Sequence, residues 1–270
     1  MWKLIGAMYN KFKKWISPSA LSKIIEINRI STQPRFHKGK SKILGREIIF
    51  SDSSSFIQSY HEIFEQKVYA FKSDISNPLI LDCGANIGLS IIYFKMIYPN
   101  ARIIGFEPDP NLFEILKTNL AQFQLNDVEL HQVAVLDTEE EVTFHVQGGS
   151  SGQVLKNHEI DASQSGIKVA SMTLTPFISS TINFLKIDIE GAEFRVLKSI
   201  SDQLHLVEKL FVEYHSFKNR GQELDLILNL LRNANFRYYL YPAVHKELPF
   251  KEIEDEEEMD MQLNIYAIRQ

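Results

Sequence analysis

The sequence predicts an α/β protein in which helices cover both faces of a mostly parallel sheet. From Leu79 onward, short apolar segments alternate with amphipathic segments of helical periodicity. Strands that alternate in this way with helices of about 10–15 residues are typical of parallel sheets. The last two apolar segments follow each other with no helical segment between them. We therefore expect an antiparallel pair at the C-terminal end of the sheet.

The elements of this sheet follow in a regular order. Strands are expected at 79–81, 102–106, 128–133, 184–187, 210–213, 236–241 and 263–268, and helices at 88–98, 109–120, 192–200 and 224–231. Asp109 is a typical N-cap residue, and Pro110 suits the first position of the helix that follows it. Residues 136–170 interrupt the alternation and predict a hairpin with a mobile loop, rich in glycine and serine, near the site.

Residues 1–75 are expected to form a basic, helical N-terminal extension or cap, and residues 76–270 the domain that contains the sheet. Within the extension, apolar residues at 43–44 and 48–50 predict a short hairpin around Gly45. A stripe of apolar residues with helical spacing follows this hairpin and predicts a helix. We expect this part of the chain to pack over one end of the sheet domain.

The composition excludes several classes of protein. The chain has 270 residues, 44% of them hydrophobic, and a single cysteine, which rules out a disulfide scaffold and a zinc site with several cysteines. No apolar run approaches the roughly 20 residues of a transmembrane helix. Residues 1–46 have a net charge of +10, whereas the remainder has −15. An acidic body repels phosphate, so we expect no nucleic-acid partner.

The basic charge at the N-terminus coincides with an amphipathic pattern. Residues 1–17 carry aromatic and aliphatic side chains three and four positions apart, with lysines between them, and Pro18 marks the end. A helix of this kind can lie on an anionic membrane surface. The alternatives are a helix packed on its own domain and an arm that joins a homodimer. We expect a cytoplasmic protein, held at a membrane periphery only in the first case.

A glycine turn after the first strand indicates a ligand site. The segment L-D-C-G-A-N-I-G at 81–88 ends a buried strand and opens a helix. Gly84 allows a tight turn and close approach of a ligand, and Gly88 allows the helix to start close to the sheet. Nineteen residues further on, Glu107 ends the second strand. A carboxylate there can accept both hydroxyls of a ribose, so the pattern indicates a nucleoside-containing cofactor.

The details of the turn favour S-adenosylmethionine over a dinucleotide. A dinucleotide fingerprint has glycine where this chain has Asn86 and Leu89. Asp82 places a negative charge beside the turn, which repels a diphosphate but suits a sulfonium and an ammonium. Cys83 lies at the end of a buried strand with no base nearby in the sequence, and we expect it to be a core residue and not a nucleophile.

A second acidic motif follows the fourth strand. In K-I-D-I-E-G-A-E at 186–193, Asp188 and Glu190 lie just beyond the strand end, at the same edge of the sheet as the glycine turn. Carboxylates placed there are costly unless paired or liganded. Glu193 falls in the first turn of the next helix, where an acid interacts favourably with the helix dipole. His215 follows the fifth strand and is either a proton acceptor or a surface histidine.

These motifs together resemble the FkbM family of S-adenosylmethionine-dependent methyltransferases. The resemblance rests on L-D-C-G-A-N-I-G, F-E-P-D, L-K-I-D-I-E-G-A-E and V-E-Y-H, and it runs from about Leu79 to His215. It implies a Rossmann-like class I methyltransferase fold with seven strands, the last of them antiparallel. It also implies methyl transfer to a hydroxyl oxygen of a sugar, glycolipid or polyketide-type acceptor.

The resemblance also assigns residues to the cofactor. It implies that Asp82, Gly84, Asn86 and Glu107 hold S-adenosylmethionine, with Gly88 completing the turn. An aromatic residue before the first strand commonly accompanies these motifs, and Tyr69 resembles it, covering the methionine end. The adenine is expected near Ala134, on the grounds of position alone.

Methyl transfer to a hydroxyl requires removal of the hydroxyl proton. We hypothesise that Asp188 or His215 takes this proton, and that Glu190 or Glu213 orients the acceptor or the base. In an alternative version, Asp188, Glu190 and Glu213 bind Mg²⁺, a hard cation that prefers oxygen ligands. The main assignment includes no metal.

Two other functions remain open from the sequence. One is an NAD-dependent oxidoreductase, which the form of the glycine turn disfavours. The other is a catalytically silent adaptor that keeps a methyltransferase fold and acts through its N-terminal helix. The carboxylates at both strand ends argue against an adaptor, because folding alone does not require them.

Overall fold

The computed structural model describes residues 18–146, 152–154, 166–218, 220–243, 250–251 and 259–270. The amphipathic helix predicted for residues 1–17 lies outside these ranges, as does most of the predicted glycine- and serine-rich loop. Within the described ranges, no helix is both long enough and apolar enough to cross a membrane.

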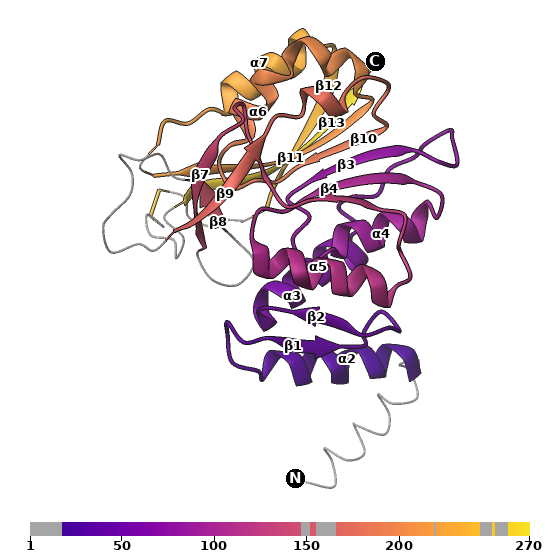
Figure 1. Cartoon of the computed structure of the whole chain (residues 1–270). Helices are drawn as coiled ribbons and strands as arrows, with labels where there is room; N and C mark the ends of the chain where they lie inside the picture. The colour runs from indigo at the N-terminus through magenta and orange to yellow at the C-terminus, as the bar shows by residue number, and fades with distance from the viewer. Residues whose placement is uncertain (1–17, 147–151, 155–165, 219, 244–249, 252–258) are drawn as a thin grey trace, which may run out of the picture.

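A seven-stranded sheet forms the centre of the molecule (Figure 1). Its strands, in spatial order, are β12 (Phe236–Pro242), β13 (Met259–Arg269), β11 (Lys209–Phe217), β10 (Phe184–Ile187), β3 (Leu79–Cys83), β4 (Arg102–Phe106) and β5 (Glu129–His131). β13 pairs antiparallel with both of its neighbours, whereas the other neighbouring strands are parallel. The predicted mostly parallel sheet with an antiparallel last strand is therefore confirmed.

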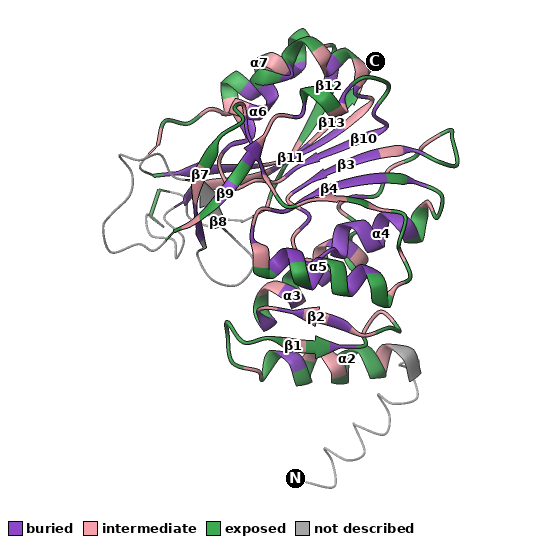
Figure 2. Cartoon of the chain, in the orientation of Figure 1, coloured by how far each residue is buried: buried purple, intermediate pink, exposed green. Residues whose placement is uncertain are grey.

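Helices cover both faces of this sheet (Figure 1). α4 (Leu89–Ile97) and α5 (Pro110–Gln122) lie on one side, and α6 (Glu193–Ser199) and α7 (Leu224–Asn233) lie on the other. Each side has its own apolar core, and the central strands between the two cores are buried (Figure 2). As expected, the Asp109 carboxylate caps α5 by accepting from the Asn111 N–H.

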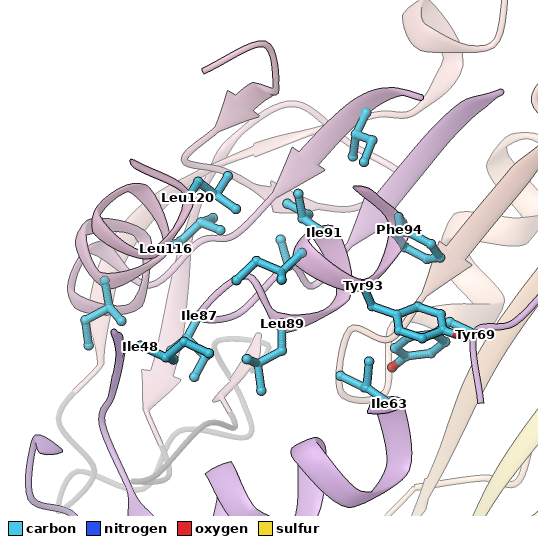
Figure 3. Close-up of a cluster of buried hydrophobic side chains, with 14 of the residues drawn as sticks. Ile48, Ile63, Tyr69, Ile87, Leu89, Ile91, Tyr93, Phe94, Leu116 and Leu120 are labelled. Carbon is cyan, nitrogen blue, oxygen red and sulfur yellow. The ribbon is translucent and has the colours of Figure 1, made fainter. Parts of the chain in front are cut away.

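The N-terminal cap packs on the α4 and α5 side. It contains α2 (Pro18–Ser31), β1 (Gly39–Ser41), β2 (Ile48–Phe50), α3 (Ser53–Tyr60) and the π-helix η1 (His61–Gln66). The fully buried Asn119 side chain of α5 joins the two parts, because it accepts from Ile49 N–H at 2.8 Å and donates to Ile49 O at 2.9 Å. Figure 3 shows Ile48 near Ile87, which lies just before α4.

The hairpin of the cap differs from its prediction. β1 lies at Gly39–Ser41, not at 43–44. Ile43 and Leu44 belong to the turn region and pack partly buried against the core. A prediction based on apolar side chains alone therefore misplaced the strand, because apolar residues in a turn can also pack against a core.

The strand predicted at 128–133 differs from its predicted bounds. The segment expected as one strand at 128–133 stops at β5, and the chain leaves the central sheet to form β6 (Ala134–Val135). β6 belongs to a small sheet ordered β6-β9-β7-β8, with β7 at Glu141–Val146, β8 at Gly152–Val154 and β9 at Ile167–Met172. β7 and β9 are antiparallel, which confirms the predicted hairpin in 136–170.

The fifth predicted strand is longer than expected. β11 continues to Phe217 because β13 pairs with it along its length, with Gln262 opposite His215. His215 is thus inside a strand and 5% exposed, instead of on a surface loop after the strand. This correction removes the interpretation of His215 as a surface histidine.

Candidate functional site

A cavity of about 730 Å³ opens at the carboxyl ends of the parallel strands. This is the edge at which ligands bind in open α/β sheets. Nine residues that the sequence singled out line it, namely Tyr69, Gly84, Asn86, Glu107, Ala134, Asp188, Glu190, Glu213 and His215. They come from segments far apart in the chain, so the fold brings the cofactor motif and the acidic motif into one space.

Two predicted residues, Asp82 and Gly88, do not line the cavity. Asp82 is fully buried on β3, where its carboxylate lies 3.2 Å from Lys186 Nζ and accepts from the Ser90 hydroxyl at 2.5 Å. The Asp82 carboxylate therefore does not face the cavity but pairs with Lys186, which does line it, and its part in holding the cofactor stays a prediction. A Cβ on Gly88 would lie 2.7 Å from Leu116 Cδ1, so this glycine allows α4 and α5 to pack closely.

The glycine turn is held against the loop that follows β10. Gly84 has a φ of +86°, and its N–H donates to Phe106 O at 3.0 Å. A Cβ at this position would lie 1.9 Å from the carbonyl oxygen of Asp188. Glycine is therefore required both by the left-handed backbone and by the close approach of the second loop.

Glu107 lies at the end of β4 and faces the same cavity. Its carboxylate accepts from the N–H groups of Asn86 and Asp109, each at 2.9 Å. Burial raises the pKa of Glu107 to about 7, although these two hydrogen bonds act in the opposite direction. The glycine turn therefore helps to fix the Glu107 carboxylate. The carboxylate lies where an acceptor of ribose hydroxyls is expected.

Lys186 is a site residue that the sequence analysis missed. It is 2% exposed and reaches Gly84 O at 2.8 Å, while its ammonium lies 3.2 Å from carboxylates of both Asp82 and Asp188. Burial alone would lower the pKa of Lys186, but the charges of Asp188 and Asp82 raise it well above its ordinary value. The sequence feature that could have identified Lys186 is its place as the only polar residue in an otherwise apolar four-residue strand.

His215 is held by a buried carboxylate. Its Nδ1 lies 2.9 Å from Glu193 Oε1, which also accepts from the Gly191 N–H at 2.9 Å. On the other side of the ring, Nε2 lies 3.5 Å from Glu190 Oε2. Burial alone would lower the pKa of His215, but Glu190 and Glu193 raise it well above its ordinary value. The two carboxylates therefore favour the charged form of the imidazole.

Glu193 has a larger role than the favourable helix-dipole interaction that the sequence predicted. It does lie in the first turn of α6, but it is 1% exposed and bonded to His215. The parallel pairing of β10 and β11, which the sequence did not specify, brings the residues near their ends together.

Glu213 completes an acidic wall with Asp188 and Glu190. Burial, reinforced by the charge of Asp188, raises the pKa of Glu213 to about 8, and the Gln262 amide donates to its carboxylate. Among the residues that the structure describes, no group of three His, Cys, Asp or Glu side chains is arranged to hold a metal ion. The Mg²⁺ version of the site stays a prediction.

The lining residues fit a cofactor that carries positive charge and no phosphate. Asp188, Glu190 and Glu213 present carboxylates to the cavity, and the cations of the described lining, Lys186 and His215, are both paired with carboxylates. A diphosphate would find no uncommitted cation there, whereas a sulfonium and an ammonium would meet favourable charge. Burial also raises the pKa of the Cys83 thiol, which agrees with a structural role for that residue.

A second part of the cavity lining was not anticipated from the sequence. It is formed by α3 and η1 of the cap and by the first residues of β13, and its members are Ser55, Gln58, Ser59, Glu62, Ile63, Met259, Asp260, Met261, Gln262 and Leu263. The sequence carried no signal that these two distant segments face one cavity, because neither contains a motif.

Comparison with known proteins places the site in context. Residues 82–238 match the family model described as the methyltransferase FkbM domain. "Methyltransferase 1" of Beauveria bassiana is 29% identical over 177 residues, which cover 57% of this chain and 71% of that protein. "2-O-methyltransferase NoeI" of Sinorhizobium fredii is 27% identical over 175 residues, which cover 57% of this chain and 71% of that protein.

A solved structure has the same fold. The crystal structure of a methyltransferase FkbM from Methylobacillus flagellatus superposes with a TM-score of 0.52 at 16% sequence identity. The superposition covers 77% of this chain but 47% of the other, so this chain spans about half the length of that protein.

Proposed function

Since this chain belongs to the FkbM family of S-adenosylmethionine-dependent methyltransferases, we propose that it methylates a hydroxyl oxygen of a sugar, glycolipid or polyketide-type acceptor. The observation that carries the proposal is the single cavity shared by two sets of residues. The glycine turn and Glu107 are on one side, and the proton-handling group of Asp188 and His215 is on the other. The name of the Sinorhizobium relative, a 2-O-methyltransferase, supports oxygen as the methylated atom.

The residues that would hold the cofactor follow from the geometry of the turn. The Glu107 carboxylate, fixed by two backbone N–H groups, would accept the ribose hydroxyls, while Gly84 leaves room beside the main chain. Tyr69 would cover the methionine end, and Ala134 would contact the adenine. When bound, S-adenosylmethionine supplies a methyl group activated by its sulfonium.

The two candidate bases differ in their readiness to accept a proton. His215 is buried between Glu190 and Glu193, whose carboxylates raise its pKa and so favour its protonated form. The Asp188 side chain is 24% exposed, lines the cavity and is held by Lys186 at 3.2 Å. We therefore assign removal of the hydroxyl proton to Asp188. His215, positioned by Glu193, orients the neighbouring carboxylates Glu190 and Glu213.

Calorimetry and labelled methyl transfer test this proposal. The purified full chain should bind S-adenosylhomocysteine and should transfer labelled methyl from S-adenosylmethionine into a glycan or lipid extract, forming a base-stable methyl ether. No heat of binding would overturn the cofactor assignment. Heat with NAD instead would favour an oxidoreductase, and binding without transfer into either extract would favour a silent adaptor. Activity that is unchanged by EDTA would exclude the Mg²⁺ version.

A further inference from the structure

The cavity lining has two parts of different origin. Most residues around the glycine turn lie inside the family match at 82–238, whereas Tyr69 precedes it. A second set of lining residues comes from α3 and η1, which precede that match, and from the start of β13, which follows it. Part of the cavity lining is therefore built by segments outside the family match.

The π-helix η1 contributes one carboxylate to this second set of lining residues. Its turns place Ile63 in the apolar core, where Figure 3 shows it near Tyr69 and Tyr93, while the preceding residue Glu62 lines the cavity. The Gln58 amide donates to Glu62 Oε1 at 3.0 Å and so fixes its carboxylate. Glu62 and Asp188 line the same cavity, and burial together with the charge of Asp188 raises the pKa of Glu62.

The charges of the lining exclude one class of acceptor. Its described residues include seven acids, namely Glu62, Glu107, Asp109, Asp188, Glu190, Glu213 and Asp260. The two cations, Lys186 and His215, are already paired with carboxylates. A phosphate, sulfate or carboxylate on the acceptor would be repelled by the ionised carboxylates of the lining, although the raised pKa values of Glu107 and Glu213, about 7 and about 8, leave these two partly protonated near neutral pH. Hydroxyl groups, in contrast, can donate to the carboxylates and bond to Gln58, Ser59 and Gln262, which also line the cavity.

We propose that Glu62, together with Gln58 and Ser59 of the cap and Gln262 of β13, forms an acceptor subsite for a neutral or amino-bearing sugar. This subsite rejects phosphorylated, sulfated and carboxylated sugars, and Glu62 is its main determinant of charge selection. The inference rests on the proposed function and adds to it the class of acceptor and the residues that select it.

Binding to a glycan array tests the selection directly. The probes are neutral, amino-bearing, phosphorylated, sulfated and carboxylated sugars, and the protein is the full chain saturated with S-adenosylhomocysteine. We compare the unmodified protein with Glu62→Gln, Glu62→Lys and Glu65→Lys. Glu65 is a matched control because it lies on the same π-helix, is 40% exposed in its side chain and pairs with His61 at 2.7 Å outside the cavity.

The unmodified protein should bind neutral or amino-bearing sugars and not anionic ones. Because a like charge at a binding interface is strongly unfavourable, Glu62→Lys should shift the ratio of anionic to neutral binding by about tenfold or more. Glu62→Gln should give a smaller shift, and Glu65→Lys should give none. Circular dichroism and the heat of S-adenosylhomocysteine binding verify that each variant is folded.

Three results would overturn the inference: preference of the unmodified protein for anionic sugars, an unchanged ratio in a folded Glu62→Lys variant, or no binding to any class of sugar. These failures differ from failure of the proposed function. Methyl transfer onto a phosphorylated hydroxyl compound would reject the subsite and leave the methyltransferase assignment intact, whereas absence of S-adenosylhomocysteine binding would reject the cofactor assignment first.

Discussion

The backbone of Gly84 lies directly against the backbone of Asp188: a Cβ on the glycine would be 1.9 Å from the aspartate carbonyl oxygen. The two residues follow neighbouring parallel strands, β3 and β10, and Lys186 bonds to both loops. The loop that would hold the cofactor and the loop that carries the proposed base Asp188 are therefore packed directly against each other.

Substitution Gly84→Ala should disrupt both loops. The new methyl group would collide with main-chain atoms of Asp188, which cannot move aside as a flexible side chain could. The φ of +86° is also unfavourable for alanine. We expect the free energy of unfolding to fall by about 2 kcal/mol or more, and S-adenosylhomocysteine affinity to fall with it. Urea denaturation and calorimetry measure the two effects. Gly221→Ala is the control, since nothing lies within 4 Å of a Cβ there. Equal behaviour of the two variants would contradict the close contact.

Replacement of Lys186 should destabilise the protein, because it leaves a buried carboxylate without its partner. Lys186→Met leaves Asp82 fully buried without its ammonium partner, so the free energy of unfolding should fall by about 3–5 kcal/mol. Adding Asp82→Asn removes the orphaned charge and should recover part of this loss. A double-mutant cycle by chemical denaturation measures the coupling. Strictly additive effects would show that the pair does not contribute as a unit.

The assignment of the base predicts different kinetics for two variants. Asp188→Asn keeps the shape of the side chain but accepts no proton, so kcat should fall by about 100-fold or more, while S-adenosylhomocysteine binding persists. His215→Gln should lower kcat less and should alter its dependence on pH, because it changes the charge beside Glu213. Rates with labelled S-adenosylmethionine across pH 6–9 would distinguish the roles. A larger loss of kcat for His215→Gln would transfer the proton-accepting role to the histidine.

The ligand-free protein should lose stability as the pH rises. Glu107 and Glu213 have folded-state pKa values of about 7 and about 8, both above the ordinary value of 4.5. Between the ordinary and the raised value, the folded state binds protons that the unfolded state has released. The free energy of unfolding therefore falls from about pH 5 to about pH 8, by up to about 1.4 kcal/mol per pH unit for each group.

Glu107→Gln tests this explanation, because glutamine does not titrate. Urea denaturation at pH 5.5, 7 and 8 should show a smaller loss of stability in the variant than in the unmodified protein. The same variant should bind S-adenosylhomocysteine more weakly, since it loses a charged acceptor for the ribose hydroxyls. An unchanged slope of stability against pH would show that Glu107 is ionised throughout this range.

The membrane contact predicted for residues 1–17 calls for a separate experiment. If the basic amphipathic segment binds an anionic surface, the full chain should co-sediment with liposomes that contain phosphatidylserine, and deletion of residues 1–17 should abolish this. High salt should weaken the binding, because surface charges are screened. Equal partition of the two proteins would exclude a membrane anchor and would favour packing on the domain or a dimer arm, which sedimentation velocity separates.

The sequence alone determined the order of the elements and the edge at which the site lies. The alternation after Leu79, the cap at Asp109 and the turn at Gly84 are local patterns that can be recognised from a few neighbouring residues. Because parallel strands end at the same edge, the motifs that follow β3, β4 and β10 were expected to meet. That expectation agrees with the cavity.

Only the tertiary structure decided which side chains face the cavity. It buried Asp82 beneath Lys186, drew His215 into a strand beside Glu193, and brought Glu62 and Gln262 into the cavity lining. These outcomes depend on the register between strands and on contacts between distant segments. Lys186 and Gly84, for example, are in contact although they are more than 100 residues apart in the chain. Pairings of this kind leave no periodic signal in the chain, because each is set by the packing of the whole fold.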